Sequence, residues 1–383
     1  MTDNSSRSAI SENITRTLAE PEGTSASATN DQIVKSITLL STGSAEAHPE
    51  HQRGTWLPLW WWVLTSRSWM DIPINLFVIE HRDGLVLFDT GLDPAIATDP
   101  NYISSSIGRF LLKRLFRFRI GEEDRLDRKL RHAGFSPENI KKAVFSHLHF
   151  DHVGGIAHIP QAELVVSREE WDVLSEPHPE REWILPEHIQ LPTANWHPVE
   201  YSPTDDPLFA PFGGSYDVMG DGSLILLPTP GHTPGSSSLL VRSQQLPPLL
   251  LIGDLAYSAE MLMENKVPGT GDASQLRQSY AKVRQLKRKL PELIIVPSHD
   301  PAALDKFKSA LSVAKTVGSR LPTEPDLGSS RRTSTDTFLQ PSMSASYPNQ
   351  KLVGSIASRF VFAKFDYCRM VMAILPLCWP LPK

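Results

Sequence analysis

Four side chains that can bind a metal ion lie within six consecutive positions of this sequence. They belong to the segment Ser146–Gly155 (SHLHFDHVGG), which directly follows an expected strand. The four are His147, His149, Asp151 and His152. Imidazole nitrogens and carboxylate oxygens suit zinc and similar divalent ions. A strand end followed by a tight loop can turn all four toward one point, and Gly154 and Gly155 allow backbone conformations that would strain other residues. A single histidine is more often a surface or core residue, but this spacing favours a metal site.

Three further metal-capable residues stand just after expected strands. His232 lies in the turn-rich sequence TPGHTPGS, Asp254 follows the strand Leu249–Ile252, and His299 follows the strand Leu293–Val296. Each residue alone would be an ordinary loop residue. The recurrence of the same placement at strand ends, where rigid elements can support a site, predicts that these residues share one centre.

The elements that must position these residues are short apolar runs separated by turn residues, which predict strands. The expected strands are Ile33–Leu40, Ile74–Glu80, Leu85–Phe88, Lys142–Phe145, Leu164–Val166, Leu224–Leu227, Ser238–Val241, Leu249–Ile252 and Leu293–Val296. Asp272–Gln275 resembles a helix N-terminal cap, with apolar residues at helical spacing up to Leu290. A second helix is expected from Pro301 to about Val317. Strands and helices in this mixture predict a layered α/β fold.

Composition excludes several classes of protein. With 40% hydrophobic residues among 383, the chain is not disordered over its whole length. A net charge of -5 argues against a dedicated nucleic-acid-binding protein. The two cysteines, Cys368 and Cys378, exclude a disulfide scaffold and a cysteine-rich zinc module. The N-terminus lacks the apolar core of a secretory signal, and no apolar run is long enough to span a bilayer, so we expect a soluble cytoplasmic protein.

In these motifs and their order the chain resembles the metallo-β-lactamase superfamily, over about Ile33 to Val317. The resemblance implies an αβ/βα sandwich with two divalent metal ions, expected to be Zn²⁺, at one edge of its paired sheets. It implies that one metal is held by His147, His149 and His232, the second by Asp151, His152 and His299, and that Asp254 bridges the two. Asp89, in the sequence FDTG, matches an early strand-end motif and is expected to support the ligands.

The chemistry expected of such a centre is hydrolysis. Two neighbouring cations lower the pKa of a shared water, and they polarise a substrate carbonyl or phosphoryl oxygen. The nucleophile is then a metal-bridging hydroxide, so no serine or cysteine nucleophile is required. Asp151 is a candidate catalytic residue, because it would orient the hydroxide as well as bind a metal. The eight other histidines are expected to tolerate replacement by Gln without loss of metal: His48, His51, His81, His132, His158, His178, His188 and His197.

Two residues narrow the range of expected substrates. A bridging carboxylate such as Asp254 is typically absent from the β-lactamases of this superfamily and fits lactonases, thioesterases and phosphodiesterases. Tyr257, three residues later, matches the tyrosine of N-acyl-homoserine lactone lactonases, the quorum-quenching lactonases, in which its hydroxyl helps to stabilise the carbonyl or leaving oxygen. We therefore expect a dinuclear hydrolase that opens a small-molecule lactone ring. An aromatic residue packed beside the strand end is the alternative for Tyr257.

Other functions stay open. The same metals would serve a glyoxalase II-like thioesterase acting on glutathione or carrier-protein thioesters. An RNA phosphodiesterase is disfavoured by the negative net charge. A metal-binding scaffold without turnover is the non-enzyme alternative, and the complete ligand set argues against it.

Two segments have no assignment from the resemblance. The aromatic segment Trp56–Trp62 is expected to be a loop that lines a substrate pocket, belongs to the core or forms a dimer contact. The basic amphipathic stretch Arg109–Arg119 would be a lid, a membrane-surface contact or a solvated face. The expected domain organisation is a flexible leader over 1–30, the hydrolase domain over 31–320 and a linker and tail over 321–383.

Overall fold

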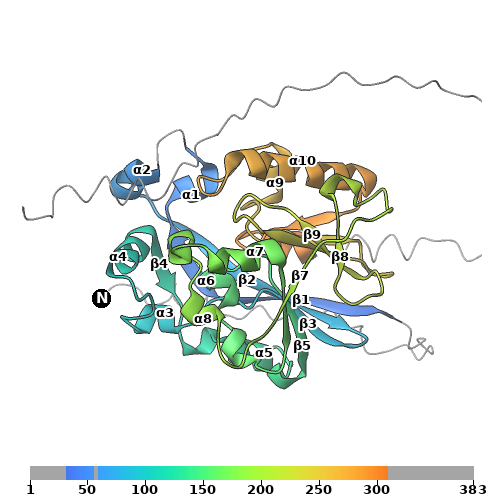
Figure 1. Ribbon diagram of the computed structural model, residues 1–383, viewed down its shortest axis with the longest axis horizontal. Coiled ribbons are helices and arrows are strands. Elements are labelled where there is room, and N and C mark those ends of the chain that lie inside the picture. The colour runs from blue at the N-terminus through green and yellow to red at the C-terminus, as the bar shows by residue number, and fades with distance from the viewer. Residues whose placement is uncertain (1–31, 56–58, 309–383) are drawn as a thin grey trace, which may run out of the picture. The chain divides into compact units, whose positions relative to one another are not determined.

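The computed structural model describes residues 32–55 and 59–308. All of the described residues belong to one compact unit, which lies within Met1–Val317. The expected leader, the expected tail and both cysteines lie outside the described residues. Among the described residues, two β-sheets form the framework, and helices cover their outer faces (Figure 1).

The first sheet has seven strands in the order β4-β1-β2-β3-β5-β6-β7. The pairs among β4, β1, β2 and β3 are antiparallel, whereas β3, β5, β6 and β7 run parallel to one another. The strands are β1 (Val34–Ala47), β2 (Met70–His81), β3 (Gly84–Phe88), β4 (Phe116–Arg119), β5 (Ile140–Val144), β6 (Glu163–Ser167) and β7 (Asn195–Val199).

The second sheet has five strands in the order β12-β11-β10-β9-β8. β10 is antiparallel to β9 and to β11, and β12 is parallel to β11, so β9, β11 and β12 run in the same direction. The strands are β8 (Tyr216–Asp217), β9 (Leu224–Pro228), β10 (Ser237–Val241), β11 (Leu249–Leu251) and β12 (Ile294–Val296).

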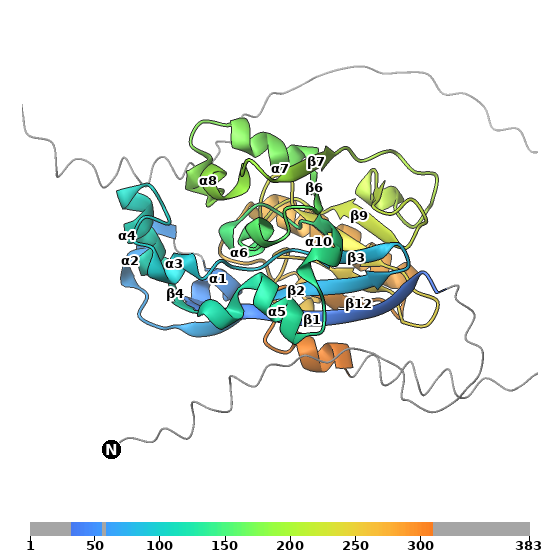
Figure 2. The same ribbon diagram turned by 90° about the horizontal axis from the view of Figure 1, so that it is seen from below.

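Alternating side chains divide the apolar residues between the layers, because successive residues of a strand point to opposite faces. Phe77 and Phe88 of the first sheet and Leu226 and Leu251 of the second belong to one buried cluster between the sheets. The intervening residues pack outward, against α5 on the first sheet and α10 on the second. Figures 1 and 2 show these two helices on opposite sides of the paired sheets. The expected αβ/βα sandwich is confirmed.

The helices lie between the strands in chain order. They are α1 (Pro49–Arg53), α2 (Leu59–Thr65), α3 (Ala95–Thr98), α4 (Ser106–Leu115), α5 (Leu126–His132), α6 (Phe150–Val153), α7 (Arg168–Asp172), α8 (Pro186–Ile189), α9 (Ala259–Met263) and α10 (Ala273–Lys289). A final helical segment covers 303–308, so the helix expected from Pro301 begins two residues later, and its expected end lies outside the described residues. Among the described residues, none of the helices is both apolar enough and long enough to cross a bilayer.

All nine expected strands are present, but three short ones were not expected. β4 has the sequence FRFR, which alternates apolar and basic residues with a period of two and lies within the expected basic amphipathic stretch. In the structure, Arg109–Arg119 divides between helix α4 and strand β4. β7 contains a proline and exposed polar residues and lies at the edge of its sheet, where proline is tolerated. β8 has two residues, too few for any periodicity.

The expectation that Trp56–Trp62 forms a loop is wrong for the second half of the segment. Helix α2 begins at Leu59, whereas 56–58 lie outside the described residues. Trp62 is 1% exposed and packs edge-on against the ring of His51, with centroids 4.9 Å apart, so this tryptophan belongs to the core. Trp61 is 46% exposed.

The helix α10 begins where the sequence predicted. The carboxylate of Asp272 accepts hydrogen bonds from the backbone N–H groups of Ser274 and Gln275, at 2.8 and 2.9 Å. The first two turns of α10 contact the loop that carries His232, since Asp272 N donates to Gly231 O and Ser279 Oγ donates to Pro230 O, both at 2.7 Å. The N-terminus of α10 therefore supports a loop of the candidate site.

Replacing Asp272 with Ala is expected to lower the free energy of unfolding by about 1 kcal/mol, because two backbone N–H groups lose their acceptor. Denaturant unfolding followed by circular dichroism measures the change. Gln278→Ala, at an exposed position of the same helix, is the matched control and is expected to change stability by less than about 0.5 kcal/mol. Equal effects of the two substitutions would contradict the capping role.

Candidate metal centre

Five strand ends meet at one edge of the sandwich and carry the site. The residues just beyond β3, β5, β9, β11 and β12 supply all the predicted ligands and their nearest support, Asp89. The contacts described below bring every predicted ligand into one cluster. Two sets of side chains within it have potential ligand atoms no more than 4.8 Å apart and are called below the first group (His147, His149 and His232) and the second group (Asp151, His152 and His299). A third set that is equally close, His147, His152 and Asp254, connects these two groups.

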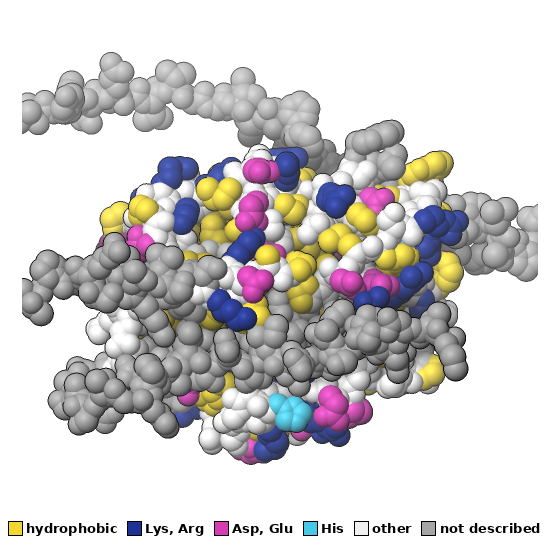
Figure 3. Space-filling model, turned by 180° about the vertical axis from the view of Figure 1, so that it is seen from behind, with side chains coloured by type: hydrophobic (Ala, Val, Ile, Leu, Met, Phe, Trp, Pro, Cys, Tyr) yellow, Lys and Arg dark blue, Asp and Glu magenta, His cyan; other side chains and the backbone are white. Residues whose placement is uncertain are grey.

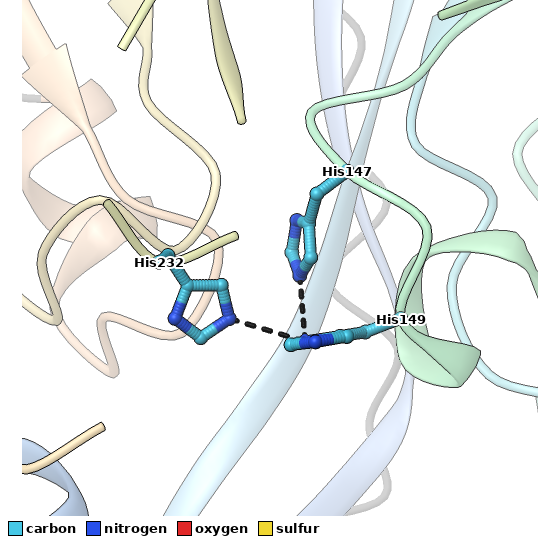
Figure 4. Close-up of side chains that lie close together, drawn as sticks. All are labelled: His147, His149 and His232. Carbon is cyan, nitrogen blue, oxygen red and sulfur yellow. Dashed lines mark hydrogen bonds between the residues drawn. The ribbon is translucent and has the colours of Figure 1, made fainter. Parts of the chain in front are cut away.

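The first group is a set of three histidines whose ring nitrogens face one another (Figure 4). His147 Nε2 lies 3.0 Å from His149 Nδ1, and His232 Nε2 lies 3.1 Å from the same Nδ1 atom. His147 and His149 come from the loop after β5, and His232 comes from the loop after β9. The group therefore joins the two sheets.

The second group lies beside the first and includes a carboxylate. Asp151 Oδ2 lies 3.3 Å from His299 Nε2, and Asp151 Oδ1 lies 3.9 Å from His152 Nε2. His152 and His299 are almost fully buried.

Asp254 lies between the two groups. Its Oδ1 atom is 3.2 Å from His152 Nε2 and 3.1 Å from His299 Nε2, and its Oδ2 atom is 3.4 Å from His232 Nε2. One carboxylate thus faces both groups, with one oxygen toward each, as expected for a residue that bridges two ions.

Backbone and side-chain acceptors fix the orientation of the buried rings. His152 Nδ1 donates to Asp89 Oδ2 at 2.9 Å, and His299 Nδ1 donates to the carbonyl oxygen of Pro73 at 2.7 Å. Asp89 also accepts from Ser146 N and Ser146 Oγ, at 2.8 and 2.9 Å. These bonds place the Nδ1 proton of each ring away from the centre and leave both Nε2 atoms facing it.

Asp89, which orients His152, has an unusual backbone conformation. Its φ of 60° is in the left-handed region, which non-glycine residues seldom occupy. Such strain persists where surrounding contacts over-determine it, and here three hydrogen bonds to one carboxylate do so. The structure agrees with the supporting position expected of this residue.

The glycines after the histidine motif serve a purpose other than the one expected. Gly154 and Gly155 have φ values of -59° and -91°, which any residue adopts, so the expectation of a special backbone conformation is wrong. A Cβ atom on Gly154 would lie 2.3 Å from the backbone nitrogen of Asp93. The glycines are required by close approach of the neighbouring loop after β3.

The residues present fit divalent cations. His152 Nε2 and Asp254 Oδ1 are buried and have no hydrogen-bond partner, although they lie 3.2 Å apart. In the first group, His149 Nδ1 has either one proton or one lone pair in the plane of its ring, so it can form a hydrogen bond with only one of the two nitrogens that face it. A cation shared by imidazole and carboxylate donors relieves both conditions.

The pKa values of the first group favour ligands without a proton. Burial, and then the neighbouring histidines, lower the pKa of His147 well below its ordinary 6.5. Burial and then His232 lower the pKa of His149 to about 3. Both rings are therefore neutral at physiological pH, and a neutral imidazole is the form that binds metals.

In the second group, the attraction between carboxylates and histidines outweighs the effect of burial on the pKa values. Burial by itself lowers the pKa of His299, but Asp254 and Asp151 outweigh it and raise that pKa to about 10. Burial opposes the ionisation of Asp151, yet His152 and His299 hold its pKa at about 2. In the absence of a metal, protons on these histidines compensate the carboxylates.

Tyr257 borders the second group. It is 5% exposed, and its ring stacks on that of His299 with centroids 6.0 Å apart and an interplanar angle of 28°. Burial, and then the charges of Asp254 and Asp151, raise the pKa of its hydroxyl well above 10. The phenol therefore keeps its proton and can act as a hydrogen-bond donor beside the centre.

One further group of metal-capable side chains occurs among the described residues, and its contacts have a simpler explanation than metal binding. His81 lies with Asp83 and Asp221. Asp83 N donates to His81 Nδ1 at 3.1 Å, His81 Nε2 donates to Asp221 Oδ2 at 3.0 Å, and the guanidinium of Arg82 lies 3.2 Å from the same oxygen. Because both ring nitrogens have partners and a cation is already present, we interpret this group as an ion-pair network.

Sequence reasoning missed Glu170, which is fully buried and contacts both histidine loops. Its oxygens accept hydrogen bonds from residues 22, 63 and 65 positions away in the chain. A local pattern, Ser167 three residues before Glu170, resembles the spacing of a capping box, but in the structure only the Ser167 half forms, because the Glu170 oxygens bind the distant loops instead.

Stability of the metal-free protein is expected to depend on pH through His299. Because its pKa is raised from 6.5 to about 10, its stabilising effect is complete below pH 6.5 and is lost as the pH rises through 10. His147 and His149 are neutral in both folded and unfolded protein over this interval and do not oppose the trend. Against the effect of burial, Asp254 and Asp89 also raise the pKa of His152 well above 6.5, so His152 acts in the same direction. We therefore expect the denaturation midpoint of chelated protein to fall between about pH 7 and about pH 9.5, and His299→Gln to make this fall smaller without abolishing it. A flat profile in the unsubstituted protein would contradict this assignment.

Comparison with known proteins gives the same family for most of the described chain. Residues 69–299 match the Metallo-beta-lactamase superfamily. The N-acyl homoserine lactonase AttM of Rhizobium radiobacter is 32% identical over 246 residues, which make up 63% of this chain and 86% of that protein. An N-acyl homoserine lactonase of a Bacillus species is 33% identical over 222 residues, covering 57% of this chain and 78% of that protein.

A solved structure agrees at the level of the fold. It is an N-acyl homoserine lactone hydrolase with the product N-hexanoyl-L-homoserine bound at its catalytic metal centre. It superposes with a TM-score of 0.57 and 24% identity, over 72% of this chain and 96% of that one. With sequence match and fold in agreement, we conclude that this chain belongs to the metallo-β-lactamase superfamily, whose members bind divalent metal ions.

Proposed function

We propose that the protein is a dinuclear metal-dependent hydrolase that opens the ring of an N-acyl-homoserine lactone or a similar small lactone. The observation that carries the proposal is Tyr257, a protonated phenol stacked on His299 beside Asp254. The relatives at about 30% identity that are named lactonases support the same substrate class.

The residues that would hold the two ions are those grouped by the geometry. One ion would be bound by His147, His149 and His232, the other by Asp151, His152 and His299, with Asp254 between them. Zinc suits this mixture of imidazole and carboxylate ligands, and we propose it as the metal. Two such cations supply a water-derived nucleophile at neutral pH and polarise the carbonyl of a bound substrate.

The protein's own groups would complete the reaction. Asp151 is ionised at neutral pH and would accept a hydrogen bond from the attacking water, fixing its direction. Tyr257 would donate a hydrogen bond to the oxygen that gains negative charge as the carbonyl carbon is attacked. Water adds to that carbon, the ring C–O bond breaks, and a proton passes to the alkoxide to give the open hydroxy acid.

The surroundings of Tyr257 suit an acyl substrate. Tyr257 belongs to a buried apolar cluster that includes Phe150 and Leu185. Ligand sites are commonly apolar with a few polar groups that fix orientation.

We also propose that the catalytic domain corresponds to 31–320.

On the part of the surface that is not covered in the view from behind, Lys, Arg, Asp and Glu side chains are interspersed with hydrophobic ones, and little histidine is seen (Figure 3). The histidines proposed as ligands are buried or half-buried, as a site for a small organic substrate requires. A small-molecule ester is therefore the substrate class that we propose.

Replacement of Asp254 with Ala is expected to abolish tight binding of at least one of the two metal ions and nearly all turnover, because one carboxylate serves both groups. Metal content of purified protein, measured by inductively coupled plasma mass spectrometry, tests this. His132→Gln, at an exposed position, is the control and should keep full metal content. Full metal content in Asp254→Ala would remove this residue from the ligand set.

Replacement of Tyr257 with Phe is expected to keep both metals and to lower kcat for lactones about 10- to 1,000-fold, the range found for loss of one oxyanion donor. Steady-state kinetics on metal-analysed protein measures this. Unchanged kcat and KM would show that the hydroxyl takes no part in the reaction.

The substrate class is tested by a panel of compounds with metal-analysed protein. The panel contains short- and long-chain N-acyl-homoserine lactones, simple γ- and δ-lactones, S-lactoylglutathione and a β-lactam. Lactone hydrolysis that disappears with chelation would support the proposal. Thioester hydrolysis without lactone hydrolysis would favour a glyoxalase II-like enzyme, and two bound metals without any turnover would favour the scaffold.

A further inference from the structure

A buried carboxylate ties together the two loops that carry the first histidine group. Glu170 lies in α7, just after β6, and is 0% exposed. Its Oε1 atom accepts from Leu148 N at 2.9 Å. Its Oε2 atom accepts from Thr233 Oγ1 at 2.7 Å and from Gly235 N at 3.0 Å. One side chain thus satisfies three donors.

These donors lie beside the three histidines. Leu148 stands between His147 and His149, and Thr233 directly follows His232. The two loops come from different sheets, after β5 and β9. Glu170 is therefore a direct link between the two halves of the first histidine group, with one oxygen toward each loop.

The same contact region fixes Glu170 itself. Ser167 Oγ accepts from Glu170 N at 3.1 Å and donates to Gly235 O at 2.7 Å. A Cβ atom on Gly235 would lie 2.0 Å from Glu170 N, so only glycine permits this approach. The start of α7 is seated against the loop after His232, which leaves the Glu170 carboxylate little freedom to move.

The second group has separate supports. His152 is oriented by Asp89 and His299 by the carbonyl of Pro73. Neither contact involves Glu170. The two groups should therefore respond differently when the Glu170 carboxylate is removed.

We propose that Glu170 is a positioning residue that sets the separation of His149 and His232. Its carboxylate would thereby determine the affinity of the metal ion held by the first histidine group, and not that of the second ion. This inference rests on the proposed metal centre but not on the identity of the substrate. Supporting groups around metal ligands commonly change metal affinity about 10- to 100-fold when they are removed.

Glu170→Gln is the sharpest test because it keeps size and shape. The amide oxygen of Gln can replace one carboxylate oxygen, but its NH₂ group would then face an N–H or O–H donor of the other loop. The matched control is Glu169→Gln, one residue earlier and exposed. Both changes remove one negative charge from the same helix, so a general electrostatic effect would appear in both.

The experiment uses the full chain, stripped of metal and titrated with Zn²⁺ against a chromophoric chelator, and in parallel with Co²⁺ followed by its visible absorption. For Glu170→Gln we expect one of two equivalents to weaken about 10- to 100-fold, with a changed Co²⁺ spectrum. The other equivalent, and both equivalents in Glu169→Gln, should match the unsubstituted protein.

Several results would overturn the proposal. Unchanged affinities and spectrum with only a lower melting temperature would make Glu170 a purely structural residue. Equal weakening of both Zn²⁺ equivalents in Glu170→Gln would contradict a selective effect on the first histidine group. An unsubstituted protein that binds no metal would overturn the proposed centre and this inference together, whereas metal binding without lactone turnover would overturn only the substrate.

A second variant covers the case in which Glu170→Gln does not fold. Thr233→Val removes one donor to Glu170 and keeps the side-chain shape. It is expected to weaken the same equivalent in the same titration by a smaller factor. Zn²⁺ affinities equal to those of the unsubstituted protein would count against the link.

Discussion

The structure depends on the burial of many ligand-type side chains in one place. Five imidazoles and two carboxylates gather at one sheet edge, with ring nitrogens 3.0 and 3.1 Å apart and a carboxylate facing three histidines. Burying polar and charged groups without compensation is unfavourable. Positive charge must therefore reside among these groups, carried by protons on His152 and His299 without a metal and by divalent cations with one.

Such a centre requires rigid supports, and each comes from a different part of the fold. Asp89 after β3 orients His152, the backbone of β2 orients His299, and Glu170 of α7 joins the loops of the first histidine group. The sandwich supplies these supports because β3 and β5 in one sheet and β9, β11 and β12 in the other end at the same edge. Each loop is short and carries its ligand within a few residues of a strand, which limits its motion.

Function follows from what surrounds the centre. Membership of the metallo-β-lactamase superfamily accounts for hydrolytic chemistry with divalent metals, but it does not determine the substrate. The choice of substrate depends on the groups that surround the centre. Here these are the carboxylate of Asp254, the protonated phenol of Tyr257 and an apolar cluster around it. A hydrogen-bond donor beside a buried apolar wall suits an acylated ring ester better than a highly charged polymer.

The sequence by itself determined the nine principal strands and pointed to the histidines and aspartates that gather in the candidate metal centre, because alternating apolar runs and closely spaced histidines are local patterns. It also determined the start of α10, since a cap and its helix are adjacent in the chain. Only the tertiary structure decided that FRFR forms an edge strand, that Trp62 is core, that Gly154 serves close packing, and that Glu170 joins two loops. These properties arise from contacts between residues distant in sequence, and no local spacing encodes which distant backbone a buried side chain will meet.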